Sequence, residues 1–175
     1  MTGAQASGKS TVADLLARRF TSAVHVRGGT FYRWAVSGWR HFDDLDHAEA
    51  RRLLELRYEL SAMVARRYAE AGFTAVAQDN IYGHDVVRWL ERVDWSPRYL
   101  VVLRPTIETL ERREAARSQA TGKVAYTDAF TPAINDAHVN ECDPSVGLWL
   151  DTTAQSPEAT VAQILDRASE ALVDP

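Results

Sequence analysis

A phosphate-loop pattern, G-x-x-x-x-G-K-[ST], begins at Gly3 and ends at Ser10. Its glycines let the backbone curl so that several N–H groups point into one concavity. The helix that follows presents its positive end to the same place, and Lys9 adds a full charge against the β- and γ-phosphates. The Ser10 hydroxyl is a magnesium ligand in this pattern. The sequence therefore predicts a site for a nucleoside triphosphate and Mg²⁺ made of Gly3, Ala4, Gln5, Ala6, Ser7, Gly8, Lys9, Ser10 and Thr11.

Helical and strand-like segments alternate along the chain, which is typical of an α/β fold with a mostly parallel sheet. Strands are expected over 23–26, 73–78, 98–103 and 146–150, and helices over 9–20, 30–37, 46–71, 85–93, 105–120, 127–140 and 157–173. The long helix is expected to face inward through Leu53, Leu56, Leu60, Met63 and Val64. No linker or repeat is visible, so we expect one domain over residues 1–175.

The strand that should precede the phosphate loop is almost missing. Such a loop normally connects a buried strand to a helix, but only Met1 and Thr2 stand before Gly3. We expect a truncated central strand, with a natural start upstream of Met1. The alternative is a fold that tolerates a two-residue strand.

Composition narrows the class of protein. A net charge of −4 in 175 residues gives no indication of a general affinity for nucleic acid or for anionic membranes. No apolar run approaches the roughly 20 residues that span a bilayer. Cys142 is the single cysteine, which excludes an internal disulfide and favours a reducing, cytoplasmic location. We expect a monomer or homodimer without a zinc site, because the histidines lack metal-ligand spacing.

Asp79 follows the apolar strand expected over 73–78. From that position a carboxylate can reach magnesium, its water or a substrate hydroxyl. The alternative is a turn that Asp79 begins together with Asn80, since such residues favour turns. We predict that Asp79 is a catalytic residue and a metal ligand beside Ser10.

Arginines cluster in the helix expected over 105–120. Arg113 and Arg117 are four residues apart and share a face. On a mobile lid around residues 112–126, hinged near Gly122, they would neutralise charge on a transferred phosphoryl group. The alternative is a solvated helix held by Glu–Arg pairs such as Glu114 with Arg117.

A further group of arginines and aromatic residues follows the strand expected over 23–26. In a parallel sheet this region lies near the open end of the cleft. Its side chains could hold an aromatic or anionic acceptor, although the tryptophans could equally be core residues. The candidates are Arg27, Arg33 and Trp34, followed by Trp39, Arg40 and His41.

Several of these segments occur in an order that resembles the small P-loop kinases related to chloramphenicol phosphotransferase, within the shikimate, gluconate and nucleotide kinase group. The resemblance covers most of the chain, but only the phosphate loop is highly specific. It rests on the phosphate loop, Gln78-Asp79-Asn80, the run Arg113 to Arg117, and Leu150-Asp151-Thr152-Thr153.

The resemblance implies a P-loop NTPase fold of three α/β/α layers, with five parallel strands and the first strand central. It also implies ATP and Mg²⁺ as cofactors and a small hydroxyl-bearing molecule as acceptor. Arg113 and Arg117 would belong to the lid, and Arg113 would also bind the nucleotide. Residues near the nucleotide base would be Asp151, Thr152 and Thr153.

The chain departs from these kinases at one point. They often carry a carboxylate just after the second strand, whereas this chain reads Val26-Arg27-Gly28-Gly29. Asp79 is then the best candidate for orienting the acceptor hydroxyl, with Asp43, Asp44 and Asp46 as alternatives. We therefore expect an ATP-dependent small-molecule phosphotransferase. The alternative is a regulatory or toxin-like nucleotide-binding module. The hypothesis of a GTPase has weaker support, because no Asn-Lys-x-Asp segment is present.

Overall fold

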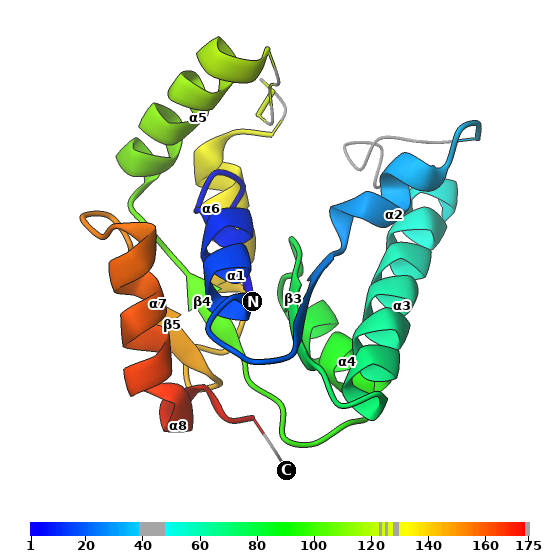
Figure 1. Cartoon of the computed structure of the whole chain (residues 1–175). Helices are drawn as coiled ribbons and strands as arrows, with labels where there is room; N and C mark the ends of the chain where they lie inside the picture. The colour runs from blue at the N-terminus through cyan, green and yellow to red at the C-terminus, as the bar shows by residue number, and fades with distance from the viewer. Residues whose placement is uncertain (39–47, 123, 125, 128–129, 174–175) are drawn as a thin grey trace.

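The computed structural model describes residues 1–38, 48–122, 124, 126–127 and 130–173 (Figure 1). Strands and helices alternate along it, which confirms the α/β class. The strands are β1 (Thr2–Gly3), β2 (Ala23–Arg27), β3 (Thr74–Gln78), β4 (Val101–Leu103) and β5 (Leu148–Leu150). The helices are α1 (Lys9–Ala17), α2 (Gly29–Trp34), α3 (Ala48–Glu70), α4 (His84–Val93), α5 (Ile107–Thr121), α6 (Pro132–Asn140), α7 (Pro157–Asp166) and α8 (Ala168–Ala171).

The strands are parallel, and the short strand β1 lies in the middle of them. β1 pairs with β4 through Thr2 opposite Val102, β4 pairs with β5, and β2 pairs with β3. Met1 joins the two groups, because its nitrogen donates to the carbonyl oxygen of Ala77 (2.8 Å) and its carbonyl oxygen accepts from the N–H of Asp79 (3.2 Å). The resulting order is β2-β3-β1-β4-β5. The first strand is therefore central, as the resemblance implies, although it has only two residues.

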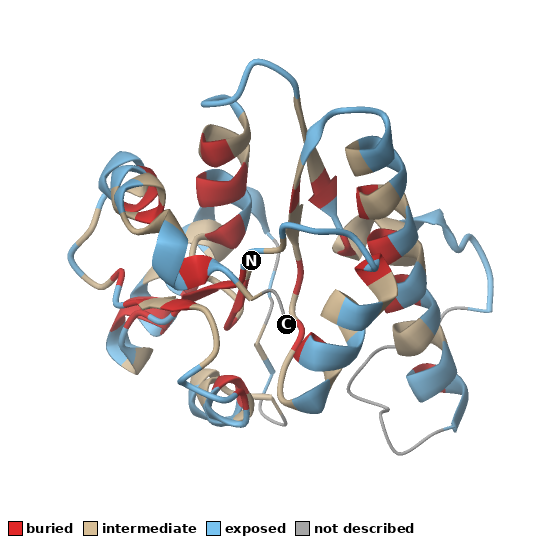
Figure 2. Ribbon diagram, turned by 90° about the horizontal axis from the view of Figure 1, so that it is seen from below, coloured by how far each residue is buried: buried red, intermediate tan, exposed pale blue. Residues whose placement is uncertain are grey.

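Helices cover both faces of these strands and produce three layers. Successive residues of a strand point to opposite faces, and on β4 Val101 and Leu103 join one apolar cluster while Val102 joins another. The first cluster includes α1 and α7, and the second includes Tyr58 of α3 and Val86 of α4. Buried residues concentrate on the strands and on the inward sides of the helices (Figure 2). This layering places the carboxyl ends of all the strands, and the loops that follow them, at one edge.

The inward face expected for the long helix is wrong for Leu56 and Met63, while Leu53, Leu60 and Val64 are partly buried. Leu56 and Met63 expose 44% and 53% of their surface. The buried face of α3 is instead formed by Ala50, Arg57, Tyr58, Ser61, Ala62 and Ala65. Small residues allow α3 to pack closely against β2 and β3, and this close packing overrides the larger apolar content of the leucine face. The leucine face is consequently left on the outside of the molecule.

Several helix boundaries differ from expectation because of capping. α5 begins at Ile107, where the side chain of Thr106 accepts the N–H of Thr109. α6 begins only at Pro132 after an equivalent cap by Thr131, so the expected helical start at Thr127 is wrong. Proline at the first position of a helix has no N–H to leave unpaired. In the described parts of the chain, none of the helices combines the length and the apolar character that crossing a bilayer requires.

Candidate nucleotide and acceptor site

The phosphate loop runs from β1 into α1, and two of its glycines adopt conformations that other residues rarely adopt. Gly3 has φ +142°, and Gly8, which precedes the first turn of α1, has φ +98°. A Cβ atom at Gly3 would also overlap the carbonyl oxygen of Leu103 on β4. Backbone geometry and the close approach of two strands therefore both require glycine in this loop.

Lys9 is buried inside the curve of the loop. Its Nζ donates hydrogen bonds to the carbonyl oxygens of Gly3 (2.8 Å) and Ala4 (2.7 Å), and among the described residues it has no carboxylate partner. Burial, reinforced by the positive charges of Arg57 and Arg117, lowers the pKa of Lys9 from 10.5 to about 7. A buried ammonium group with cations around it and no counter-charge is suited to bind an anion.

The affinity for a triphosphate is expected to fall as the pH rises from about 7.5 to 9.5, with a slope approaching tenfold per pH unit. Free Lys9, with its pKa near 7, is mostly neutral in this range, and bound phosphates restore its positive charge. Binding therefore takes up a proton, and a higher pH opposes it. Titration calorimetry at several pH values measures the slope. In Lys9→Met the affinity should be lower and independent of pH, and the same slope in this variant would exclude Lys9 as its source.

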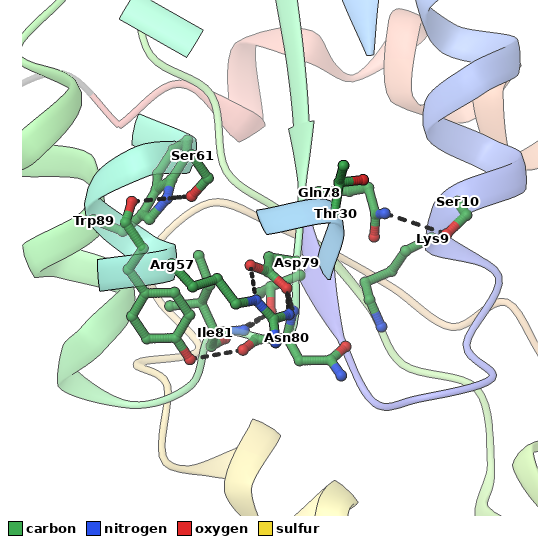
Figure 3. Close-up of polar contacts among 12 residues, drawn as sticks. Lys9, Ser10, Thr30, Arg57, Ser61, Gln78, Asp79, Asn80, Ile81 and Trp89 are labelled. Carbon is green, nitrogen blue, oxygen red and sulfur yellow. Dashed lines mark hydrogen bonds and ion pairs between the residues drawn. The ribbon is translucent and has the colours of Figure 1, made fainter. Parts of the chain in front are cut away.

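The hydroxyl of Ser10, exposed at the start of α1, is in contact with Gln78 and not with Asp79. Gln78 Nε2 donates to Ser10 Oγ at 3.2 Å, whereas the Asp79 side chain points toward Arg57 on α3 (Figure 3). Arg57 Nε donates to Asp79 Oδ2 at 2.8 Å, its Nη2 pairs with Oδ1, and the N–H of Asn80 donates to Oδ1 at 2.8 Å. Magnesium binding by Ser10 and Asp79 stays a prediction, and the structure does not bring the two side chains together.

The Asp79 carboxylate occupies the space that a side chain at position 28 would need. A Cβ atom on Gly28, directly after β2, would overlap the Asp79 carboxyl group. This is the region where the resembling kinases often carry an acid. The glycine after β2 and the acid after β3 are thus sterically coupled. The carboxyl group of Asp79, which follows the neighbouring strand, therefore lies beside the backbone position where those kinases carry their acid.

Gly28→Ala is expected to destabilise the fold by about 1–3 kcal/mol, because Asp79 must leave its place beside Arg57. Thermal or urea unfolding measures the loss. Gly29→Ala is the matched control, since its added Cβ meets only Arg33 Nη1 at 3.9 Å. This control should be neutral or slightly stabilising. Equal stability of the two variants would contradict the coupling between Gly28 and Asp79.

Of the two arginines predicted for the lid, Arg113 reaches from α5 to the phosphate loop. Arg113 Nη1 donates to the carbonyl oxygen of Ser7 (3.2 Å), and its Nη2 donates to that of Thr152 (2.8 Å). Arg117 pairs with Glu114, and its charge is one of those that lower the pKa of Lys9. The structure therefore brings Arg113 to the loop, and for Arg117 it shows the Glu–Arg pair of the alternative interpretation.

The segment after β5 also meets this site. Asp151 Oδ1 accepts the N–H of Thr153 (2.9 Å), and Thr153 Oγ1 accepts the N–H of Thr106 (2.9 Å). Thr152 reaches the phosphate loop through Arg113. The position of this segment beside the loop agrees with a nucleotide-base region, and that role stays a prediction.

A polar network that no sequence pattern indicates holds the phosphate loop at Gln5. Asn135 on α6 is fully buried, and its Oδ1 accepts the N–H of Gln5 at 2.7 Å. Its Nδ2 donates to the Tyr82 hydroxyl (2.8 Å), and Tyr126 donates its hydroxyl proton to the carbonyl oxygen of Gln5 (2.6 Å). These residues stand up to 130 positions apart from Gln5, and no local motif marks them. The network fixes the loop at Gln5.

A cleft of about 710 Å³ adjoins the loop at Gln5. This volume falls within the range of small-molecule sites, about 300–1,000 Å³. Its walls come from α2, α3, the start of α4 and α6, and include Tyr32, Arg33, Arg51, Arg57, Phe130 and His138. Near-parallel rings form part of the wall, because His138 lies 6.1 Å from Tyr82 and 6.2 Å from Phe130 between ring centroids.

Of the three residues predicted from the sequence to bind the acceptor molecule, only one lines the cleft. Arg33 lines the cleft. Arg27 lies away from the cleft lining, and its Nε donates to His25 Nδ1 at 3.4 Å. Trp34 is 67% exposed and contacts Phe31 edge to face, so it is not a core residue. The other candidates, Trp39, Arg40, His41, Asp43, Asp44 and Asp46, lie outside the described residues.

The glycine loop, the buried lysine and the short central strand behind them define a P-loop protein with a kinase-type fold. The chain belongs to a family of P-loop domains described as "AAA domain", whose model matches residues 1–132. No curated protein sequence matches the chain significantly.

Solved structures share the fold at low sequence identity. The APS kinase of Mycobacterium tuberculosis, solved with AMPPNP and APS, aligns with a TM-score of 0.67 at 18% identity, covering 96% of this chain and 94% of that one. The tunicamycin resistance protein of Deinococcus radiodurans aligns at 0.64 and 14% identity, covering 99% and 96%. A gluconokinase of Sinorhizobium meliloti aligns at 0.55 and 16% identity, covering 96% and 93%.

Proposed function

We propose that the protein is a Mg²⁺- and ATP-dependent phosphotransferase that moves the γ-phosphate to a hydroxyl group of a small molecule. The observation that carries this proposal is the position of Lys9. Its Nζ is buried without a described counter-ion, in a loop that opens through Gln5 onto a cleft of small-molecule size. The APS kinase and the gluconokinase, which share the fold, support the same class of reaction.

In the proposed reaction, Lys9 and the loop N–H groups hold the β- and γ-phosphates. The acceptor oxygen forms a bond to the γ-phosphorus, the bond to the β-γ bridging oxygen breaks, and ADP leaves with that electron pair. Mg²⁺, when bound at the Ser10 hydroxyl, would neutralise phosphate charge. Arg113 and Arg117 would stabilise the transferred group, and Asp79 would orient the acceptor hydroxyl and take its proton. Positioning and charge neutralisation dominate such a reaction.

The acceptor is proposed to carry a flat ring or an anionic group, and the cleft favours a molecule with both. Arg33 and Arg51 line the cleft, and within the described residues neither has a carboxylate partner. The acidic lining residues already have partners, because Asp85 lies 3.7 Å from Arg88 and Glu141 Oε1 lies 3.0 Å from His138 Nδ1. The rings of Tyr82, His138 and Phe130 offer stacking surfaces for a planar group.

A labelled-ATP transfer screen tests the proposed function. The acceptors should be sets of nucleosides, sugars, gluconate, APS and antibiotics, each tested with and without an anionic substituent. Labelled product that disappears in Lys9→Ala would support the proposal. ATP binding by calorimetry without product from any acceptor would favour the nucleotide-binding module. The engagement of both Asp79 oxygens by Arg57 is the observation that favours this second candidate.

Arg51→Ala is expected to raise the KM for an anionic acceptor by about ten- to a hundredfold, because it removes a charge-assisted contact worth about 1.5–3 kcal/mol. The KM for the matched neutral acceptor and for ATP should be unchanged. Arg52→Ala is the matched control, since Arg52 is the next residue on α3 and is not among the residues that line the cleft. Equal effects of Arg51→Ala on both acceptors would exclude anion recognition by Arg51.

A further inference from the structure

The outer face of α3 carries an apolar stripe. Leu56 and Met63 are exposed, and Leu53 and Leu60 are partly exposed, while the opposite face of the helix packs against β2 and β3. Exposed leucine and methionine side chains in one row are costly in water unless another surface covers them. Figure 1 shows α3 at the side of the molecule, with α4 on its inner side.

The stripe has the spacing of a coiled-coil seam. Its positions alternate by four and three residues, as the a and d positions of a heptad do, and they run Glu49, Leu53, Leu56, Leu60, Met63 and Arg67. The four central positions are apolar, and the two end positions are charged and exposed. One end is acidic and the other is basic.

This order makes the stripe complementary to itself when two copies of α3 run antiparallel. A two-fold axis beside position 58 sets Leu56 against Leu60 of the partner subunit and Leu53 against Met63 of the partner subunit. The same alignment sets Glu49 against Arg67 of the partner subunit at both ends. Within one chain Arg67 Nη1 lies 2.7 Å from Glu70 Oε2, so each Glu49 would share its arginine with that carboxylate. A displacement of this register by three residues would oppose Arg52 to Arg67 of the partner subunit, which is repulsive. Charge and apolar pattern thus favour the alignment about position 58 over the one displaced by three residues.

We propose that the occupant of this stripe is a second copy of the chain, joined through an antiparallel α3–α3 contact into a two-fold symmetric homodimer. A contact of this kind is isologous, because each pair occurs twice. It leaves the cleft open, since Arg51, Arg57 and Tyr58 line the cleft from other faces of the same helix. Four apolar positions per chain make a small interface, so the dimer is reversible and concentration-dependent.

Sedimentation equilibrium of the full chain tests the dimer. The wild type should show a monomer–dimer equilibrium, which Leu56→Asp abolishes while far-UV dichroism and ATP binding stay unchanged. Glu49→Arg and Arg67→Glu should each weaken the dimer about tenfold, because each turns two attractive pairs into two repulsive ones. The double variant Glu49→Arg/Arg67→Glu should restore it. Glu91→Arg on α4 carries the same charge change and should have no effect.

Disulfide trapping tests the register. Under mild oxidation, a mixture of Leu56→Cys and Leu60→Cys chains should cross-link to each other faster than either variant cross-links to itself, while the native Cys142 is buried. Faster self-cross-linking of Leu56→Cys would indicate a parallel contact and overturn the proposal. A wild type that remains monomeric at the highest soluble concentration would also overturn it. Neither result depends on whether the protein transfers phosphate.

Discussion

Replacing Lys9 by alanine is expected to reduce phosphoryl transfer by about a thousandfold or more, which corresponds to roughly 4 kcal/mol of transition-state stabilisation. The amino group of Lys9 lies inside the curve of the loop, where its Nζ donates hydrogen bonds to two loop carbonyl oxygens. Bound phosphates would replace those carbonyl contacts with charged ones in a site shielded from water, where electrostatic interactions are strong. Steady-state kinetics with labelled ATP and an accepted substrate measures the loss, and calorimetry measures the accompanying loss of nucleotide affinity.

The stability of the Lys9→Ala variant separates catalysis from folding. Because burial lowers the pKa of Lys9, its charged form is unfavourable in the free protein, and its removal should leave the thermal unfolding temperature nearly unchanged. Lys9→Arg, which keeps a positive charge, should retain more nucleotide affinity than Lys9→Ala. Near-normal transfer by a folded Lys9→Ala protein would place the phosphate site elsewhere and contradict the proposed function.

The phosphate loop could be located from sequence because its chemistry is local. Nine consecutive residues contain the glycines, the lysine and the hydroxyl, and in the structure they run from the end of β1 into the first turn of α1. The face of α3 could not be chosen in the same way, because the helix has two apolar sides. Periodicity selected the leucine side, whereas the sheet is packed by alanines and by Tyr58.

The surroundings of the candidate site depend on contacts between distant segments, which a single sequence does not reveal. The sequence indicates that Asp79 is a strand-end carboxylate, but its partner Arg57 stands 22 residues earlier in the middle of a helix. Asn135 holds the loop from 130 residues away. The steric coupling of Gly28 to Asp79 depends on the register of β2 against β3, which sets Arg27 opposite Gln78. In each case the contact depends on how distant segments pack against each other in the folded chain.

Asp79→Asn is expected to reduce turnover strongly while sparing nucleotide binding, and also to destabilise the fold by about 3–5 kcal/mol. Asp79 is 5% exposed, and its oxygens pair with the guanidinium of Arg57. Asparagine keeps the shape but removes the charge, so Arg57 is left buried and charged without a counter-ion. Urea unfolding measures the loss of stability, and calorimetry measures the affinity for ATP. Steady-state kinetics gives kcat and the KM for the acceptor.

The double variant Asp79→Asn/Arg57→Gln distinguishes a catalytic carboxylate from one that only positions Arg57. It removes both charges, so most of the lost stability should return whatever the role of Asp79. If Asp79 takes the proton of the acceptor hydroxyl, kcat stays low in the double variant. If Asp79 only holds Arg57 in the cleft wall, Arg57→Gln alone should raise the acceptor KM as much as Asp79→Asn does, with little change in kcat. Normal turnover of Asp79→Asn would show that Asp79 neither takes the proton of the acceptor nor positions Arg57 for the reaction.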